Sequence, residues 1–369
     1  MEGGCVNIST DSRDASDCDD CERKLCYIVR IKSKLPIPNA DNIVLAEING
    51  ISWQCIIKKD EFQEGDLAIY YAIDSVPDFS DPNTALVKSR GNRIKTIKLR
   101  GVISQGLLAP LSWLADRGHS IDSLSEGEDV TDRMGVTKYI HEEEEAQYDP
   151  YFNPDQLSSS LGMRTPFPAG VPKTNENRLQ ENPRVLEYIE GRNIVITRKE
   201  DGCSATYVLR NDEFSICGRN FTLLNLTAQS QHYFEIEDRY NIQSGMKKLG
   251  RELAIQGEIV GPKINGNRMK LSGNDFRVFN IKDLMTECYL SWEEVESVCA
   301  SLGLHTVPVI YKGISSNLDL TVEGMLRVAD EQRYAKNLIA EGIVVKTNDG
   351  GRRCSFKVIS NKYLLKYDR

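Results

Sequence analysis

The chain has 369 residues, of which 40% are hydrophobic and 8% aromatic, so it is long enough for two domains of ordinary size. No run approaches the roughly 18 consecutive apolar residues of a transmembrane helix, and the N-terminus lacks the features of a signal peptide. We therefore expect an intracellular protein, in the cytoplasm or nucleus, with no membrane partner. The formal net charge of −8 argues against non-specific coating of nucleic acid.

The N-terminal segment is strongly acidic. Residues 1–26 carry seven acids and three bases. This composition predicts an acidic, disordered tail over residues 1–25. The alternative is a zinc site, because the C-x-x-C pair of Cys18 and Cys21 lies close to Cys5 and Cys26. Most of the ten cysteines lie singly in apolar segments and are predicted to be reduced.

Residues 26–132 contain short apolar segments separated by turn signals, which is the pattern of β-strands. About five or six strands in about a hundred residues predict an OB-type β-barrel, a fold often used to bind oligonucleotides. The fold alone does not establish that use. The segments are YIVRIKS, NIVLAEING, SWQCIIKKD, DLAIYYAID, RIKTIKLRG and SQGLLAPLS.

One of these segments is strongly basic. In KSRGNRIKTIKLRG the strand alternation places Ile97 and Leu99 on the face opposite Lys98 and Arg100. A basic strand face can contact phosphates, so Lys95, Lys98 and Arg100 are the candidate RNA-binding residues. The alternative is a solvated edge strand, where basic residues suppress unwanted strand pairing.

Residues 133–172 have little periodicity, an acidic run over 142–145 and several prolines, and they predict a linker between domains. Residues 173–369 mix strand-like and helical segments and predict an α+β domain built on antiparallel sheets. Within it, SWEEVESVCASLG predicts a helix that is capped by Ser291 and ends at Gly303.

Several short polar clusters follow or interrupt apolar strands of this second domain, and strands that end in charge often line a site. In chain order they are RKEDG, CGRN, QGEIVG, FRVFNI and AEGIVVK, with SFKV close behind. This order resembles the covalent nucleotidyltransferase superfamily of ligases and capping enzymes, in which the first motif is K-x-D-G. Lys199, Asp201 and Gly202 match that motif.

The resemblance implies that Lys199 attacks the α-phosphate of ATP and forms a lysyl-AMP phosphoramidate. Chemically, an amine becomes a nucleophile when burial or cationic neighbours lower its pKa. The resemblance also implies catalytic roles for Asp201, Glu258 and Glu341, which would hold Mg²⁺ or Mn²⁺ through its waters. The alternative is that these acids only cap strand ends.

Further residues are implied to bind ATP or AMP. Phe279 matches the position of a ring that stacks on adenine, with core packing as the alternative, whereas Phe276 is assigned to the core. Arg219 matches an arginine that contacts the ribose or the RNA end, and Arg178 in VPKTNENRLQ matches one that engages the ATP phosphates. The remaining candidates for the nucleotide are Arg198, Lys346 and Lys357, with Lys362 and Lys366 as weaker alternatives.

The sequence departs from the family pattern in two places. The motif K-x-D-G-x-R of DNA ligases and capping enzymes has Ser204 here in place of the arginine, which favours RNA ligases. The last motif usually contains K-x-K, but here Ser355 replaces the first lysine, and Arg352 or Arg353 could compensate.

An N-terminal OB domain ahead of the nucleotidyltransferase domain resembles the fifth class of ATP-dependent RNA ligases. That class seals 3′-hydroxyl to 5′-phosphate RNA ends, preferably at nicks in duplexes or where a complementary strand bridges the ends. We expect a monomer in which the barrel binds RNA and the second domain carries adenylylation of Lys199. The alternatives are a capping-type guanylyltransferase and a non-catalytic RNA-binding protein.

Overall fold

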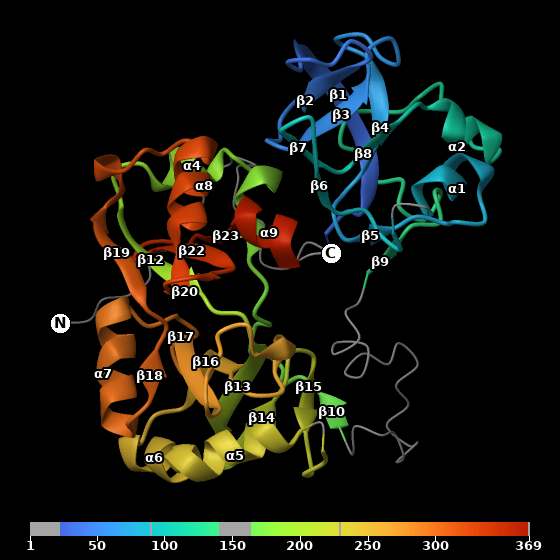
Figure 1. The fold of residues 1–369 in the computed structure, drawn as a ribbon. Coiled ribbons are helices and arrows are strands. Elements are labelled where there is room, and N and C mark those ends of the chain that lie inside the picture. Colours follow the sequence, from blue (N-terminus) through green and yellow to red (C-terminus); the bar gives the residue numbers. More distant parts are fainter. Residues whose placement is uncertain (1–22, 89–90, 140–163, 229, 368–369) are drawn as a thin grey trace.

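The computed structural model describes residues 23–88, 91–139, 164–228 and 230–367. We call residues 23–139 of this range the barrel domain and residues 164–367 the C-terminal domain; Figure 1 shows them side by side. Cys5, Cys18, Cys21, the acidic run over 142–145 and residues 1–22 of the predicted tail lie outside the described residues. The prediction that the tail extends to residue 25 is wrong, because Leu25 is buried in the core of the barrel domain and Arg23 pairs with Glu181. No helix in the described ranges is long and apolar enough to cross a membrane.

The barrel domain is built on an antiparallel sheet with the strand order β3-β2-β1-β4-β8. A hairpin of β6 and β7 packs beside β3, where the Ile56 amide donates to Ser104 Oγ at 2.9 Å, and nearly closes the barrel. The prediction of an OB-type barrel is confirmed. The strands are β1 (Cys26–Pro36), β2 (Ile43–Ile48), β3 (Gln54–Lys58), β4 (Leu67–Tyr71), β6 (Thr96–Leu99), β7 (Val102–Gln105) and β8 (Leu107–Ala109).

The centre of this sheet is buried on both faces. Inside the barrel, Trp53 and Tyr70 are almost fully buried, while Ile28 and Ile69 pack on the other side against Leu114 of α2 (Ser112–Asp116). Continuous apolar runs in β1 and β4 are the expected consequence of two covered faces. Cys26, the fourth cysteine of the zinc alternative, is fully buried in this core.

The basic strand is shorter than the sequence pattern suggested. Lys98 is exposed on β6, but Arg100 and Gly101 form the turn to β7, with φ of 49° and 85°. Two consecutive positive φ angles are typical of a type I′ hairpin turn. The prediction that Arg100 shares the strand face of Lys98 is therefore wrong. Two small β-strands, β5 (Ser75–Val76) and β9 (Thr137–Lys138), and helix α1 (Pro82–Lys88) complete this domain.

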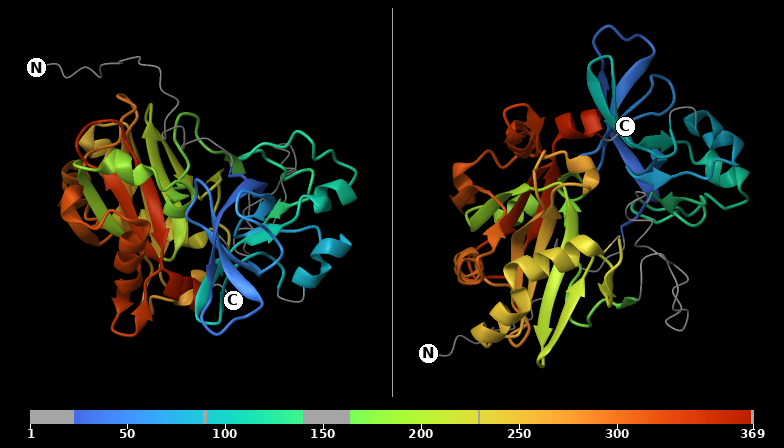
Figure 2. Two further views of the ribbon diagram at one scale, coloured as in Figure 1. Left: turned by 90° about the horizontal axis from the view of Figure 1, so that it is seen from above. Right: turned by 60° about the horizontal axis from the view of Figure 1, so that its bottom comes forward.

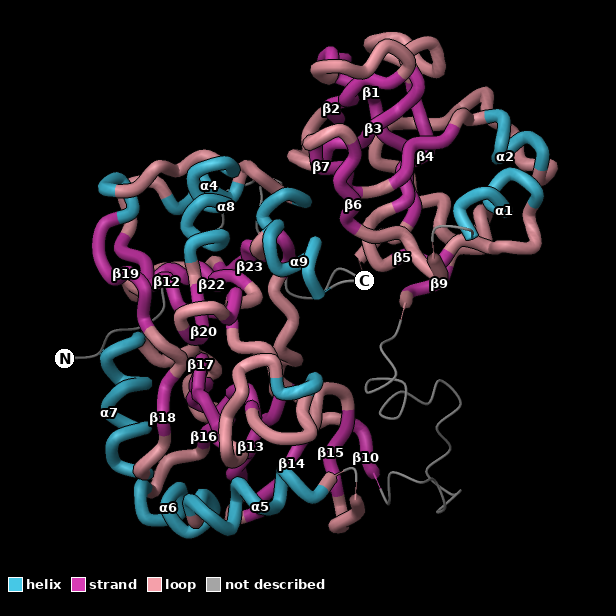
Figure 3. The backbone as a smooth tube through the Cα atoms, viewed as in Figure 1, coloured by secondary structure: helices cyan, strands magenta, loops and turns pink. Residues whose placement is uncertain are grey.

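The C-terminal domain contains two sheets, which Figure 3 shows as separate groups of strands. The larger has the order β10-β15-β14-β13-β16-β17-β18, and the smaller β11-β23-β22-β12-β19; a short hairpin of β20 and β21 lies beside them. Pairing is antiparallel except for β11 with β23 and β17 with β18. The larger sheet comprises β10 (Arg164–Pro166), β13 (Cys203–Arg210), β14 (Glu213–Cys217), β15 (Phe221–Leu223), β16 (Leu253–Val260), β17 (Asp275–Asp283) and β18 (His305–Thr306). The others are β11 (Asn177–Arg178), β12 (Asn193–Lys199), β19 (Val309–Ile314), β20 (Arg333–Ala335), β21 (Leu338–Ile339), β22 (Gly342–Thr347) and β23 (Ser355–Ile359).

Each sheet has its own core. Helices α5, α6 and α7 cover the larger sheet, and α4 and α8 pack on the smaller one. The right view of Figure 2 shows α5 and α6 along the outer side of the larger sheet, and both views place the barrel beside the C-terminal domain. The helices are α4 (Val185–Ile189), α5 (Gln231–Tyr240), α6 (Ile242–Leu249), α7 (Trp292–Leu302), α8 (Val322–Glu331) and α9 (Asn361–Tyr367).

Helix α7 begins and ends where its sequence predicts. Ser291 Oγ accepts from the Glu294 amide, and the Glu294 carboxylate accepts from the Ser291 amide, so both halves of a capping box are present. Gly303 ends the helix with φ of 67°, a left-handed conformation that suits glycine. The predicted α+β class with antiparallel sheets is confirmed.

Phe276 on β17 is fully buried and meets Tyr207 edge-on, with ring centroids 5.1 Å apart. We expect Phe276→Ala to lower the free energy of unfolding by about 3–5 kcal/mol, because it leaves a cavity in the core of the larger sheet. Denaturant unfolding of this variant and of Phe279→Ala, a half-buried phenylalanine on the same strand, measures the difference. Equal losses in the two variants would contradict the core assignment of Phe276.

Candidate active site between the two sheets

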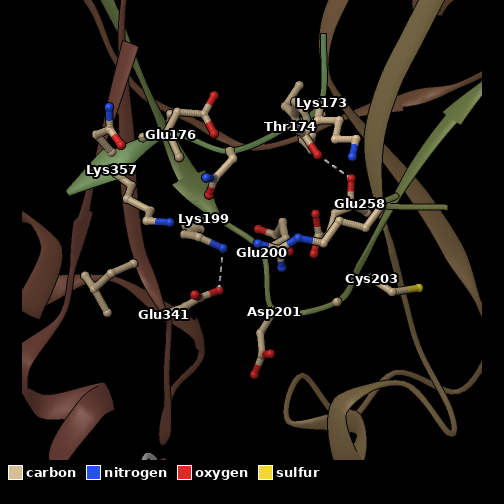
Figure 4. A pocket seen from close by; sticks show the side chains of 18 of the residues that line it. Lys173, Thr174, Glu176, Lys199, Glu200, Asp201, Cys203, Glu258, Glu341 and Lys357 are labelled. Carbon is tan, nitrogen blue, oxygen red and sulfur yellow. Dashed lines mark hydrogen bonds and ion pairs between the residues drawn. The ribbon is translucent and has the colours of Figure 1, made fainter. Parts of the chain in front are cut away.

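The K-x-D-G motif is the link between the two sheets. Lys199 is the last residue of β12 in the smaller sheet, and Cys203 is the first residue of β13 in the larger one. A Cβ on Gly202 would lie 2.2 Å from the Ile259 carbonyl oxygen, so no larger residue fits there. The link therefore passes directly under β16, and Lys199 projects into the space between the sheets, as Figure 4 shows.

Lys199 is held by an acid and a tyrosine. Its Nζ donates to Glu341 Oε2 at 2.8 Å, and Glu341 directly precedes Gly342, the ladder partner of Lys199. The Tyr334 hydroxyl donates to the Lys199 carbonyl at 2.9 Å and accepts from the Glu341 amide at 3.1 Å. Both ends of the Lys199–Glu341 pair are thus fixed by one side chain that the sequence did not point to.

The pKa of Lys199 is shifted upward, which is opposite to the shift that favours a nucleophilic amine. Burial by itself lowers the pKa of Lys199, but the nearby carboxylates of Glu341 and Glu258 outweigh burial and hold the pKa above its ordinary value. The protein groups around Lys199 therefore do not supply the lowered pKa that a nucleophilic amine needs. Before Lys199 can act as a nucleophile, the negative charge around it has to be offset.

The three predicted acids do not converge on one point. Glu258 lies on β16 facing Lys199, and burial, reinforced by Glu341, raises its pKa to about 8 against the opposing effect of Lys199. Asp201 points away from Lys199 in Figure 4. It accepts from Tyr363 at 2.6 Å, Arg268 at 3.0 Å and Asn265 at 3.0 Å.

Glu258 and Glu341 fit a divalent cation, while Asp201 is engaged elsewhere. No group of three or more His, Cys, Asp or Glu side chains within the described ranges could hold a metal ion. Magnesium commonly binds through one or two carboxylates, with waters and substrate phosphates as the other ligands. Two carboxylates on either side of Lys199 provide that smaller set of hard oxygen donors.

Two lysines form the positively charged side of the site. Lys346 on β22 donates to the Phe279 carbonyl at 2.7 Å, and burial, helped by Arg353, lowers its pKa to about 7. Lys357 on β23 also has its pKa lowered to about 7, by burial and then by Arg178 and Lys199. A bound anion would relieve both effects, because it pairs the lysines without returning them to water.

The place of the missing lysine is occupied by a polar cluster. Ser355 Oγ donates to Glu176 Oε1 at 3.2 Å, and Arg353 Nη2 lies 3.7 Å from the same oxygen. Burial opposes the charge on Glu176, but Lys346 and Arg353 outweigh it and hold its pKa below the ordinary value. Of the two arginines expected to compensate for Ser355, Arg353 is the one in this cluster.

The other predicted nucleotide contacts take different positions. Arg178 on β11 is the ladder partner of Lys357 and donates to Asp74 of the barrel domain at 3.0 Å. Arg198 donates to Glu200 at 2.6 Å and lies over the ring of Tyr334, so its guanidinium is already engaged by protein groups. Arg219 lies in the turn between β14 and β15.

One cavity of about 1350 Å³ joins these groups. Its lining includes every predicted catalytic residue and the main predicted nucleotide-binding residues: Lys199, Asp201, Glu258, Glu341, Arg178, Arg198, Arg219, Phe279, Lys346 and Lys357. The weaker alternatives, Lys362 and Lys366, are not in this lining. The candidate RNA-binding residues Lys95, Lys98 and Arg100 are not in this lining. The barrel domain contributes Arg23, Leu25, Asp74, Lys138 and Tyr139 instead, which no motif had indicated.

Comparison with known proteins identifies relatives of both parts of the chain. A family model described as RNA ligase matches residues 192–359, and an OB-fold domain model matches residues 25–111. No curated protein matched the sequence. Three solved structures of Naegleria gruberi RNA ligase are similar over 94% of this chain. A variant with ATP and Mn has 32% identity over 99% of its own chain and a TM-score of 0.77. A variant with AMP and Mn has 33% identity over 99% of its own chain and a TM-score of 0.76. A structure with PPi has 33% identity over 100% of its own chain and a TM-score of 0.77.

We expect buried Lys346 to lower the free energy of unfolding, by an amount that depends on pH. Its pKa is 10.5 when unperturbed and about 7 in the folded chain, so between these values the unfolded chain holds a proton that the folded chain lacks. The contribution of Lys346 to stability therefore rises with pH across this window and falls as pH drops through 7. Lys346→Met removes this contribution, while that of Lys357 remains in both proteins.

We expect the stability of Lys346→Met relative to the parent to be highest near pH 6. The difference should shrink toward pH 9 by up to about 1.4 kcal/mol per pH unit. Denaturant unfolding at three pH values measures it, with Lys98→Met, an exposed lysine on β6, as the control for loss of a charge. A difference that does not change with pH would contradict the lowered pKa.

Proposed function

Because the chain belongs to the ATP-dependent RNA ligases with an N-terminal OB domain, we propose that it joins RNA ends through a lysyl-AMP intermediate on Lys199. RNA ends are the substrate of this family. The observation that carries the proposal is the position of Lys199 between an acidic pair, Glu258 and Glu341, and a buried basic pair, Lys346 and Lys357. Such an arrangement suits an amine that attacks a phosphate whose negative charge must be held in place.

In the first step, Lys199 Nζ attacks the α-phosphorus of ATP, a P–N bond forms, and the bond to the β-phosphate breaks with loss of pyrophosphate. Lys199 has to lose a proton first, and Glu341 orients its amine at 2.8 Å. Lys346, Lys357 and Arg178 would bind the phosphate oxygens, since all three line the same cavity. Phe279, half-buried on the cavity wall, would stack on adenine.

Glu258 and Glu341 would hold Mg²⁺ or Mn²⁺. The use of a divalent ion is supported by the similar Naegleria ligase structures, which contain Mn together with ATP or AMP. The ion would offset the carboxylate charge that raises the pKa of Lys199 and would neutralise the phosphate. Asp201 would act through position: its contacts with Arg268 and Tyr363 connect the K-x-D-G link to helix α9.

In the later steps, AMP passes from Lys199 to the RNA 5′-phosphate, and the 3′-hydroxyl then attacks that phosphate and releases AMP. We propose that the preferred substrate is a nick in a duplex or ends bridged by a complementary strand, bound by a monomer. The proposed domains are the RNA-binding barrel, predicted over 26–132, and the nucleotidyltransferase domain, predicted over 173–369. The predicted linker over 133–172 is shorter at both ends, because Met134 and Val136 lie in the barrel core and β10 pairs in the larger sheet. Lys95, Lys98 and Arg100 remain candidates for contact with RNA outside the cavity.

Replacing the nucleophile tests the covalent step. We expect Lys199→Ala and Lys199→Arg to lose AMP labelling and sealing, because neither side chain offers the amine, while Lys199→Arg keeps the charge beside Glu341. Intact mass after pyrophosphate treatment and then incubation with ATP and Mg²⁺ detects the gain of one AMP. Labelling that survives in either variant would exclude Lys199 as the nucleophile.

The nature of the substrate is tested by comparing RNA substrates. We expect a nicked duplex with 3′-hydroxyl and 5′-phosphate ends to be sealed at least about tenfold faster than the same strands without the bridging strand. The reason is that base pairing holds both ends in register, which saves the entropy of bringing them together. Single-turnover sealing by the AMP-loaded enzyme measures the ratio, and equal rates would exclude the preference for nicks.

A further inference from the structure

Asp74 of the barrel domain has its backbone clamped in an unusual conformation. It follows β4 with φ of 65°, a left-handed conformation that aspartate tolerates better than most residues. Its amide donates to the Ile94 carbonyl at 2.8 Å, and its carbonyl accepts from the Tyr139 amide at 2.8 Å. With both peptide groups fixed, the side chain of Asp74 is held in the wall of the cavity shared with the C-terminal domain.

Three arginines surround this carboxylate. Arg178 Nη2 of the C-terminal domain lies 3.0 Å from Asp74 Oδ2, whereas Arg93 and Arg23 of the barrel domain lie at 3.5 and 3.9 Å. Arg178 is therefore the closest cation and the only one of the three that comes from the other domain. The bond joins two chain segments that are 104 residues apart.

Of the two terminal nitrogens of Arg178, Nη2 is hydrogen-bonded to Asp74 and Nη1 is not hydrogen-bonded within the described part of the chain. Its side chain is only 11% exposed, and its Nη1 is buried without a hydrogen-bond partner in the described part of the chain. A buried guanidinium N–H without a partner is costly, so such a group points to a ligand. Arg178 is the ladder partner of Lys357, and both line the cavity that holds Lys199. The unused Nη1 thus belongs to a positively charged wall where a phosphate oxygen would be its natural acceptor.

We propose that Asp74 is a positioning residue for adenylylation: it holds Nη2 of Arg178 so that Nη1 meets a phosphate oxygen of ATP. This inference rests on the proposed function of Arg178 as a phosphate ligand. Asp74 does not touch ATP, and its effect passes through Arg178. The barrel domain then takes part in the reaction with ATP, in addition to any contact with RNA.

The test uses the full-length enzyme and two variants that keep the positive φ. Asp74→Gly removes the carboxylate without backbone strain, and Asp74→Asn retains one acceptor oxygen. We expect Asp74→Gly to raise the KM for ATP or slow single-turnover adenylylation of Lys199 by about tenfold, the value of one charge-assisted hydrogen bond, with a smaller loss in Asp74→Asn. Sealing of a nick that already carries AMP on its 5′-phosphate should be unchanged, because that step needs no ATP phosphates.

A double-mutant cycle separates positioning from a general effect on domain packing. If Asp74 acts through Arg178, then Asp74→Gly should cause no further loss of adenylylation in an Arg178→Ala background. The matched control is Glu126→Ala, another barrel carboxylate that pairs with Arg30 at 3.1 Å away from the cavity lining, and it should behave as the parent enzyme.

Each other outcome has a definite meaning. Normal adenylylation by Arg178→Ala would remove the phosphate-binding role of Arg178 and the inference with it. Slow adenylylation by Arg178→Ala but not by Asp74→Gly would overturn only the role of Asp74. An equal loss from Asp74→Gly in both backgrounds, or an equal loss in sealing of the AMP-carrying nick, would show that Asp74 acts through domain packing. A lower KM for ATP in Asp74→Gly would mean that Asp74 competes with ATP for Arg178, which also overturns the proposal.

Discussion

The structure depends on one short connection. This connection consists of Glu200, Asp201 and Gly202, which join the last residue of β12 in the smaller sheet to the first residue of β13 in the larger sheet. Each sheet packs against its own helices. Because Gly202 lies against the Ile259 carbonyl oxygen, the two sheets come within reach of a single lysine side chain. Side chains from β16 and β17 on one side and from β22 and β23 on the other then line the same cavity as Lys199. A longer link, or a larger residue than glycine, would separate them.

Acidic and basic side chains both line this space. Glu341 and Glu258 lie beside Lys199, while Lys346, Lys357 and Arg178 come from β22, β23 and β11. Burial disfavours the charged form of groups in both sets. It raises the pKa of Glu258 and lowers the pKa of Lys346 and of Lys357. Substrate phosphates and a divalent ion would complement the two sets, so the free energy lost by burying these charged groups would be offset when the charged substrate binds. Burying these charged side chains without full pairing thus lowers the stability of the chain, and substrate binding would offset that loss.

Features that depend on local sequence pattern or on a motif could be predicted from the sequence. The Ser291 cap of α7, the strands of the barrel and the burial of Phe276 were predicted from the sequence, and ten residues predicted from the motifs line one cavity. What the sequence missed depends on contacts between distant segments. Tyr334 binds Lys199 across 135 residues, and Asp201 binds Tyr363 across 162, so no local signal marks either pair. The raised pKa of Lys199 has the same origin, since it is set by the balance of burial against Glu341, directly before β22, and Glu258 on β16.

The junction of the domains explains why a barrel residue can influence a reaction in the other domain. The Ser52 amide donates to the Gln180 carbonyl at 2.8 Å, and Arg23 pairs with Glu181 at 2.9 Å, directly beyond Arg178 in the chain. The segment that carries Arg178 is therefore fixed on both sides, by β23 within its own domain and by the barrel across the junction. Proteins that bind a large charged substrate gain affinity when its ligands are held before it arrives. A barrel that restrains Arg178 in this way would hold one cationic side chain of the cavity in position before a substrate binds.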